Sequence, residues 1–271
     1  VLSLIFLRKL NNLKMILVER TPLMELSIYF NFIDFIKKNV IKILIYFLYK
    51  SSDEVVCNSK FMSKHFKIQY KINTKTIFPP SLIYSAQNKK KVYKRYDTLM
   101  IVTVCRLTKE KGLNILLHAL SLLKFKNYNL LVVGDGPEKL KLKKLSKKLH
   151  ISQNIKYFGF LNDVKPILKL SNLYINSSYF EGFPNSVVEA INYGIPVISS
   201  QSYGGINEIL AGGKYGTIFK NGDSYDLARK IENYYNNPKK FLLKTNYAKH
   251  NTKRFTLYKN IRNYESLFNT I

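Results

Sequence analysis

The sequence predicts an α/β protein built from doubly wound, Rossmann-like domains. From residue 98 onward, short apolar runs alternate with helical stretches, the pattern of a parallel sheet covered by helices on both faces. Several of these runs end in a glycine-bearing loop, as tight strand-to-helix connections require. A shorter series of the same kind occupies residues 14–78, which indicates a second domain.

The N-terminal series begins with apolar runs that are typical of buried strands. One loop in it, Glu19-Arg20-Thr21-Pro22, follows an expected strand at its carboxyl end, where open α/β sheets contact ligands. The elements expected here, in order, are strands at 1–7 and 14–18, one or two helices at 28–50, a strand at 54–57, a helix at 60–66 and a strand at 76–78.

The second series follows a polar, basic stretch that we interpret as a linker. We therefore expect a partial N-terminal domain at 1–85, a linker at 86–96, a larger domain at 97–255 and a final helix at 256–271. The larger domain is expected to contain strands at 98–104, 128–133, 155–158, 173–176, 196–199 and 216–219. Its expected helices are at 112–124, 137–149, 163–170, 184–193, 225–235 and 238–250.

The charge of the chain is unusual, with 44 Lys+Arg against 17 Asp+Glu and a net charge of +27. Nucleic-acid binding, attraction to an anionic membrane and a general drift toward lysine would each produce such an excess. The basic residues are scattered, apart from one dense helical run at 139–148, and no nucleic-acid motif is present. We therefore favour drift together with contact to a membrane surface.

No metal or disulfide framework is expected, because Cys57 and Cys105 stand apart in apolar runs and only four histidines are present. The apolar start lacks the basic flank and cleavage site of a signal peptide. The best membrane-spanning candidate, residues 40–49, is far too short to cross a bilayer. These features fit a reducing cytoplasm.

The stretch 177–190 carries more chemistry than any other. Pro184 suits the first position of a helix that ends at Gly194, so a glycine-bearing loop leads directly into a helix N-terminus, a favourable place for an anion. Glu181 and Glu189 flank this N-terminus. We expect both carboxylates to point into one crevice and to accept hydrogen bonds from hydroxyl groups, which suggests a phosphorylated sugar ligand.

The residues Glu181-Gly182-Phe183-Pro184-Asn185-Ser186-Val187-Val188-Glu189-Ala190, followed by Gly194-Ile195-Pro196-Val197, resemble the paired-glutamate signature of retaining GT-B glycosyltransferases. The most similar group is family four, also called glycosyl transferases group 1, whose members build bacterial surface polysaccharides. The resemblance covers about residues 97–270 well. It implies that Glu181 contacts the donor sugar, that Glu189 contacts the ribose, and that Gly182, Phe183, Pro184 and Asn185 surround the phosphate or sugar.

A pair of cations completes the expected donor site. Arg106 comes just after the expected strand at 98–104 and Lys111 stands at the start of the next helix, so both can reach the crevice above the sheet. Together they would neutralise a departing diphosphate. The family has Arg and Lys at this spacing, whereas we expect their neighbour Lys109 to play no part; scattered surface charge is the alternative interpretation.

Two glycine loops are weaker candidates for binding the base. Gly134-Asp135-Gly136-Pro137 follows a strand but fails the dinucleotide fingerprint, because Lys139 stands where its third glycine belongs. Phe158-Gly159-Phe160 resembles the family loop that pairs with the base edge. A further residue, Glu208, is expected to be structural, as an acid in the first turn of a helix.

We therefore expect a retaining glycosyltransferase that moves a hexosyl or N-acetylhexosaminyl group from a nucleotide-diphosphate sugar to a lipid-linked or polysaccharide acceptor. No metal or other cofactor is expected. The expected place is the cytoplasm, at the inner face of the cytoplasmic membrane. The N-terminal part is short for the family, so a catalytically weak donor-binding remnant is one alternative, and a basic nucleic-acid-binding protein is a more distant one.

Overall fold

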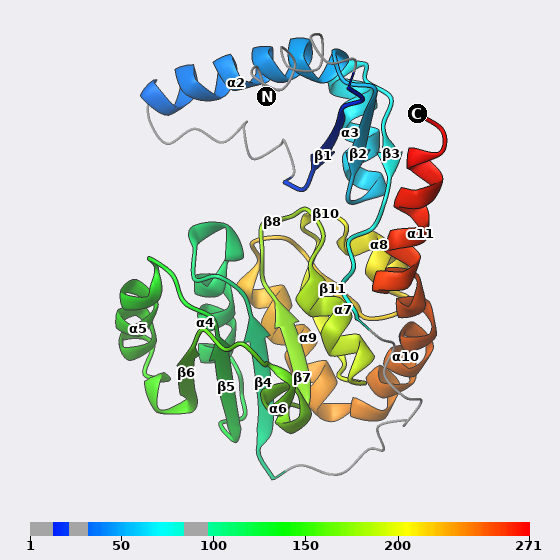
Figure 1. Cartoon of the computed structure of the whole chain (residues 1–271). Coiled ribbons are helices and arrows are strands. Elements are labelled where there is room, and N and C mark those ends of the chain that lie inside the picture. Colours follow the sequence, from blue (N-terminus) through cyan, green and yellow to red (C-terminus); the bar gives the residue numbers. More distant parts are fainter. Residues whose placement is uncertain (1–12, 22–31, 84–96) are drawn as a thin grey trace.

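The computed structural model of the chain describes residues 13–21, 32–83 and 97–271, and the statements below concern these residues. The strand expected at 1–7, the beginning of the helix expected at 28–50 and the linker expected at 86–96 lie outside them. The described residues form a small N-terminal lobe, here residues 13–21 and 32–78, above a larger C-terminal lobe, residues 97–255 (Figure 1).

Six parallel strands form the sheet of the C-terminal lobe, in the order β11-β9-β7-β4-β5-β6. The chain runs from β4 outward to β6 and then returns to β7 on the other side of β4, so the topological switch lies between β4 and β7. Ligands of open α/β sheets bind at this switch, outside the carboxyl ends of the strands. The strands are β4 (Leu99–Val104), β5 (Tyr128–Val133), β6 (Ile155–Gly159), β7 (Leu173–Asn176), β9 (Val197–Ser200) and β11 (Thr217–Phe219).

Helices cover both faces of this sheet (Figure 1). Successive strand residues point to opposite faces, so Ile101 enters a core packed by α4 and α9, whereas Val102 enters a core packed by α7 and α8. The predicted doubly wound α/β fold is therefore confirmed. The helices are α4 (Leu113–Ser121), α5 (Lys139–Lys148), α6 (Lys165–Leu170), α7 (Asn185–Asn192), α8 (Ile206–Leu210), α9 (Ser224–Asn236) and α10 (Pro238–Asn251).

The N-terminal lobe has a smaller parallel sheet, β1-β2-β3. Phe66 and Met62 of its helix α3 are fully buried, and Ser59 caps that helix by accepting a hydrogen bond from the backbone N–H of Met62. Among the contacts of the described residues, the C-terminal part of helix α2 packs on the lobe, where Tyr49 stacks on Phe66. The elements are β1 (Ile16–Glu19), α2 (Phe32–Lys50), β2 (Glu54–Cys57), α3 (Lys60–Tyr70) and β3 (Lys75–Thr76).

The C-terminal helix α11 (Leu257–Phe268) lies against the N-terminal lobe (Figure 1). Its buried residue is Leu267, which packs with Val56 and Ile77. The side chain of Asn260 donates a hydrogen bond of 2.7 Å to the backbone carbonyl of Phe78. Of the apolar side chains on this helix, Tyr258, Ile261 and Phe268 are exposed.

An aromatic cluster lies beneath the junction of the two lobes. The rings of Phe78, Phe183 and Phe255 meet pairwise with centroids 5.0–5.7 Å apart. The guanidinium of Arg254 lies 4.6 Å from the Phe255 ring centroid. This cluster joins the end of the N-terminal lobe to the loop before α7, so packing here sets how the lobes face each other.

Glu208 links the lobes in a way that its position in the sequence did not indicate. It lies in the first turn of α8, as expected, but its carboxylate accepts a hydrogen bond of 3.0 Å from the backbone N–H of Phe61. It therefore caps the N-terminus of α3 in the other lobe, where free N–H groups and the helix dipole favour a negative charge.

Two features of the described residues bear on the sequence predictions. None of their helices is long and apolar enough to cross a membrane. Both cysteines are free thiols, and burial raises the pKa of Cys105 to about 12 and that of Cys57 to about 11.

The Glu208 cap predicts a local stability effect. Glu208→Ala should lower the free energy of unfolding by about 1–2 kcal/mol, because it removes the acceptor for the backbone N–H of Phe61 and leaves Ser59 as the remaining cap of α3. The amides of residues 60–62 should also exchange faster with deuterium, which mass spectrometry measures. Glu208→Gln keeps one acceptor oxygen, so its stability and its exchange rates should lie between those of the parent and those of the alanine variant. Unchanged exchange in the alanine variant would contradict a capping role.

Candidate active site

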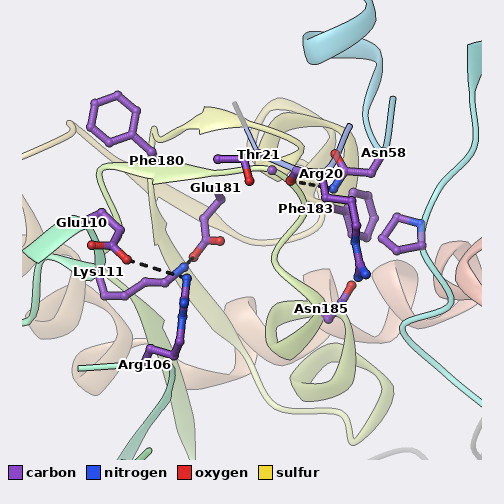
Figure 2. A pocket seen from close by; sticks show the side chains of 12 residues that line it. Arg20, Thr21, Asn58, Arg106, Glu110, Lys111, Phe180, Glu181, Phe183 and Asn185 are labelled. Carbon is purple, nitrogen blue, oxygen red and sulfur yellow. Dashed lines mark hydrogen bonds and ion pairs between the residues drawn. The ribbon is translucent and has the colours of Figure 1, made fainter. Parts of the chain in front are cut away.

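A cavity of about 180 Å³ lies between the two lobes, above the carboxyl ends of β4 and β7. It therefore occupies the switch point of the C-terminal sheet. Figure 2 shows side chains entering it from both lobes. The residues that line it are Arg20, Thr21, Asn58, Pro79, Arg106, Glu110, Lys111, Phe180, Glu181, Gly182, Phe183 and Asn185.

The strongest interaction in the cavity joins two of the predicted residues. The ammonium of Lys111 lies 3.0 Å from the carboxylate of Glu181, with side chains only 15% and 12% exposed (Figure 2). Lys111 ends a 3₁₀ turn (Lys109–Lys111), and α4 begins only after Gly112, so it precedes the helix that we expected it to start. Because both groups are largely removed from water, each is needed to balance the charge of the other.

Arg106 enters the same cavity from the loop after β4. Its guanidinium lies 3.9 Å from the Glu110 carboxylate, and its side chain is 79% exposed. Since an exposed pair at this distance is weak, Arg106 can turn toward a bound anion at little cost. The structure thus brings Arg106, Lys111 and Glu181 together, as the sequence predicted.

Glu181 is held in place by a network of polar side chains. It lies in the short strand β8 (Phe180–Glu181), which pairs with β10 (Tyr203–Gly204), rather than in a free loop. The hydroxyl of Ser178 lies 2.7 Å from its carboxylate and 2.9 Å from the side-chain oxygen of Asn176. Having one proton, this hydroxyl donates to one of them at a time.

The loop and helix start after Glu181 form one wall of the cavity. Gly182, Phe183 and Asn185 line it, whereas Pro184 is buried behind them. The helix α7 begins at Asn185, so Pro184 is its N-cap. We had expected Pro184 to be the first residue of the helix. The fully buried hydroxyl of Tyr174 lies 2.7 Å from that of Ser186 and fixes this first turn on the sheet.

Glu189 lines a different cavity, of about 710 Å³, with Asn162, Asp163, Lys165 and other residues. Glu181 and Glu189, which we expected in one crevice, therefore line two separate cavities. A helix rises 1.5 Å per residue, so Glu189 lies about 6 Å further along α7 than Asn185. The hydroxyl of Ser81, which lines the larger cavity, donates 2.8 Å to Asn185, so the cavities adjoin at this pair.

The remaining predicted residues line neither cavity. Gly134 and Gly136 pack against the backbone carbonyls of Cys105 and Leu107, where an added Cβ would lie 1.9 and 2.6 Å away. Their loop does not start α5 directly, since that helix begins at Lys139. Gly159 accepts a hydrogen bond of 2.7 Å from the backbone of Gly134, while its neighbours Phe158 and Phe160 are exposed.

Several cavity residues were not among the predicted site residues. Arg20 and Thr21 belong to the loop after β1, whose position at a strand end had already suggested ligand contact. Asn58 follows β2 in the same manner. No sequence pattern marked Glu110, Phe180 or Pro79 as a site residue, although Glu110 and Phe180 stand beside the predicted residues Lys111 and Glu181. Among the described residues, no group of three His, Cys, Asp or Glu side chains is arranged to hold a metal ion.

The two paired glutamates have different electrostatic environments. Burial raises the pKa of Glu189 to about 7. Glu189 thus keeps its proton in the folded state between about pH 4.5 and 7, where the unfolded chain has lost it. The free energy of unfolding must therefore fall as pH rises through this window.

This shift predicts that Glu189→Gln removes part of the pH dependence. As pH rises from 4.5 to 8, the free energy of unfolding of the variant should increase by roughly 2 kcal/mol relative to that of the parent. This is less than the full shift in the pKa of Glu189 implies, because the side chain is only half-buried. Urea denaturation at several pH values measures this difference. A difference that does not vary with pH would show that the Glu189 carboxyl is ionised throughout.

Comparison with known proteins identifies related chains. MJ1059 of Methanocaldococcus jannaschii, an uncharacterized glycosyltransferase, is 31% identical over 179 residues, covering 60% of this chain and 43% of its own. The lipopolysaccharide core biosynthesis glycosyltransferase LpsE of Rhizobium meliloti is 26% identical, covering 68% of this chain and 54% of its own. The chain thus spans about half the length of these curated relatives.

The fold also resembles solved structures. HepE of Anabaena, in a crystal structure with UDP and glucose, superposes with a TM-score of 0.82 at 19% identity, covering 98% of this chain and 74% of its own. At this identity the likeness establishes the fold, which is the GT-B arrangement of glycosyltransferases. Residues 85–254 match the sequence profile of the family described as glycosyl transferases group 1, and the chain belongs to that family.

Proposed function

We propose that this protein binds a nucleotide-diphosphate sugar between its lobes and is a retaining glycosyltransferase. The observation that carries the proposal is the largely buried Lys111–Glu181 pair, placed beside Arg106 and the N-terminus of α7 at the switch point of the sheet. A cation, a helix N-terminus and a hydroxyl acceptor in one small cavity suit the diphosphate and the sugar of such a donor. The UDP and glucose in the HepE structure support this ligand class.

In the proposed reaction, the bond between the anomeric carbon and the donor phosphate breaks, and the acceptor hydroxyl oxygen bonds to that carbon from the same face. The acceptor proton passes to the departing phosphate oxygen. Arg106 and Lys111 stabilise the negative charge that develops on the leaving diphosphate. With these cations in place, we propose that no metal ion is required.

The paired glutamates take separate parts of the donor in this proposal. Glu181 accepts hydrogen bonds from sugar hydroxyls in the smaller cavity, with Gly182, Phe183 and Asn185 around it. Glu189 reaches the ribose from the larger cavity. Two cavities that adjoin at the Ser81–Asn185 pair match a ligand with a sugar-diphosphate end and a nucleoside end.

The acceptor and the type of sugar belong to the same proposal. We propose hexosyl or N-acetylhexosaminyl transfer to a lipid-linked or polysaccharide acceptor in cell-surface glycan synthesis; the similarity to LpsE, a glycosyltransferase of lipopolysaccharide core biosynthesis, supports the general pathway. The alternative is a donor-binding chain with very slow transfer. Release of nucleoside diphosphate with an acceptor present, measured against hydrolysis alone, separates the two.

We further propose peripheral contact with the inner face of the cytoplasmic membrane. The chain carries a net charge of +27, which favours anionic lipid surfaces. Helix α2 adds a row of exposed apolar side chains among lysines, a combination that suits the interface between headgroups and acyl chains. These exposed side chains include Phe32, Ile33, Ile36, Val40, Ile43 and Phe47.

The donor site predicts a specific loss of binding. Arg106→Ala and Lys111→Ala should each weaken UDP or GDP binding by about 1.5–3 kcal/mol, because each removes a charge-assisted hydrogen bond. Calorimetry measures this, and EDTA should leave the parent's affinity unchanged. Lys109→Ala, in the same turn but outside the cavity, is the matched control. Parental affinity in both site variants would reject this site.

Membrane contact predicts salt-sensitive adsorption to vesicles of anionic phospholipid, with little binding to neutral vesicles. Replacing Ile43 and Phe47, one turn apart and 58% and 63% exposed, by serine should reduce adsorption at least tenfold. The control replaces Leu140 and Leu243, which are 72% and 60% exposed on the C-terminal lobe. Equal binding to neutral and anionic vesicles would refute the electrostatic part of the proposal.

A further inference from the structure

Arg20 enters the donor cavity from the lobe opposite the other two cations. It follows β1 at the carboxyl end of the N-terminal sheet, and it lines the same cavity as Arg106 and Lys111. In Figure 2 its side chain extends from the upper lobe toward Asn185, whereas Lys111 and Arg106 approach from the other side. Three cations from two lobes thus surround one small space.

The backbone that carries Arg20 is fixed by contacts from both lobes. The Glu19 carboxylate accepts hydrogen bonds of 2.9 Å from the backbone N–H groups of Arg20 and Thr21, and one of 2.8 Å from the Tyr49 hydroxyl. The buried side chain of Asn58 donates 3.0 Å to the Arg20 carbonyl. Glu19, the other charged residue of this loop, is therefore occupied in shaping it.

The C-terminal lobe also restricts the position of the Arg20 backbone. A Cβ added to Gly182 would lie 1.9 Å from the Arg20 carbonyl oxygen. The glycine therefore lets the loop before α7 touch the loop after β1 directly. Such direct contact places the Arg20 side chain at a defined point of the cavity rim.

The charges in the cavity are unequal. Lys111 is paired with Glu181, and Arg106 lies 3.9 Å from Glu110. No carboxylate of the described residues lies within ion-pair distance of the Arg20 guanidinium. Among the described residues that line the cavity, three cationic side chains thus face two carboxylates. The one without a carboxylate among these residues is an arginine, whose planar fork suits two phosphate oxygens at once.

We infer that Arg20 is a third diphosphate-binding residue, contributed by the N-terminal lobe. The inference rests on the proposed function and extends it, because the donor then bridges the lobes and not only the C-terminal sheet. Arg20 and Asn185 would hold one side of the diphosphate while Lys111 and Arg106 hold the other.

The test is calorimetric titration of the full chain with UDP, GDP, UMP and GMP. Arg20→Ala should lower the affinity for the diphosphate that the parent binds at least tenfold. It should also reduce the ratio of diphosphate affinity to monophosphate affinity, because Arg20 would contact the diphosphate. Arg20→Lys should recover part of the loss, since it keeps the charge but not the fork. Arg229→Ala, which removes an exposed arginine of α9, is the matched control and should bind as the parent does.

The possible outcomes separate the inference from the proposal beneath it. If the parent binds a diphosphate and Arg20→Ala binds it equally tightly, Arg20 is not a donor ligand and the inference is overturned. Unchanged donor binding with lost sugar transfer would assign Arg20 to the acceptor and would overturn it as well. A parent that binds none of the four nucleotides would instead refute the proposed function. Thermal unfolding of Arg20→Gln checks that the loop keeps its structure.

Discussion

The backbone of residues 177–183 lies against other backbone on three sides, and the cavity proposed to bind the donor depends on this packing. A Cβ on Gly112 would lie 2.3 Å from the Ser177 carbonyl oxygen, and one on Gly204 would lie 1.4 Å from that of Glu181. Gly182 meets Arg20 from the other lobe in the same way. Because these contacts involve no flexible side chains, the direction of the Glu181 side chain is set before any ligand binds. Such preorganisation lowers the cost of stabilising charge in a reaction.

The same packing brings opposite charges together in a place largely shielded from water. Lys111 and Glu181 balance each other's charge in the cavity. A donor would have to replace this contact, with phosphate oxygens taking the lysine and sugar hydroxyls taking the carboxylate. Ser178 and Asn176 remain beside Glu181 during such an exchange and hold its orientation. Both partners of this ion pair could thus turn to the ligand, Lys111 to its phosphate and Glu181 to its sugar hydroxyls.

The two glutamates of the motif differ because their surroundings differ. Glu181 has a lysine partner, whereas burial alone raises the pKa of Glu189 to about 7. A carboxyl group in that state carries a proton for part of the physiological pH range and can either donate or accept a hydrogen bond. Two residues of the same type thereby gain different chemistry from their environments.

The sequence by itself determined the fold class and the core of the site. Alternating apolar runs and helices indicate a parallel sheet. Arg106 and Glu181 follow strands whose carboxyl ends meet at one edge of such a sheet, and Lys111 comes shortly after Arg106. Only the tertiary structure decided that Glu189 lines a second cavity, that Glu208 caps α3, and that Arg20 lines the same cavity as Arg106 and Lys111. The last two depend on contacts between lobes: Phe61 and Glu208 are 147 positions apart, and local periodicity carries no information about such pairs. Periodicity fixes the side of a helix on which a residue lies, but the packing of a second lobe determines what that side faces.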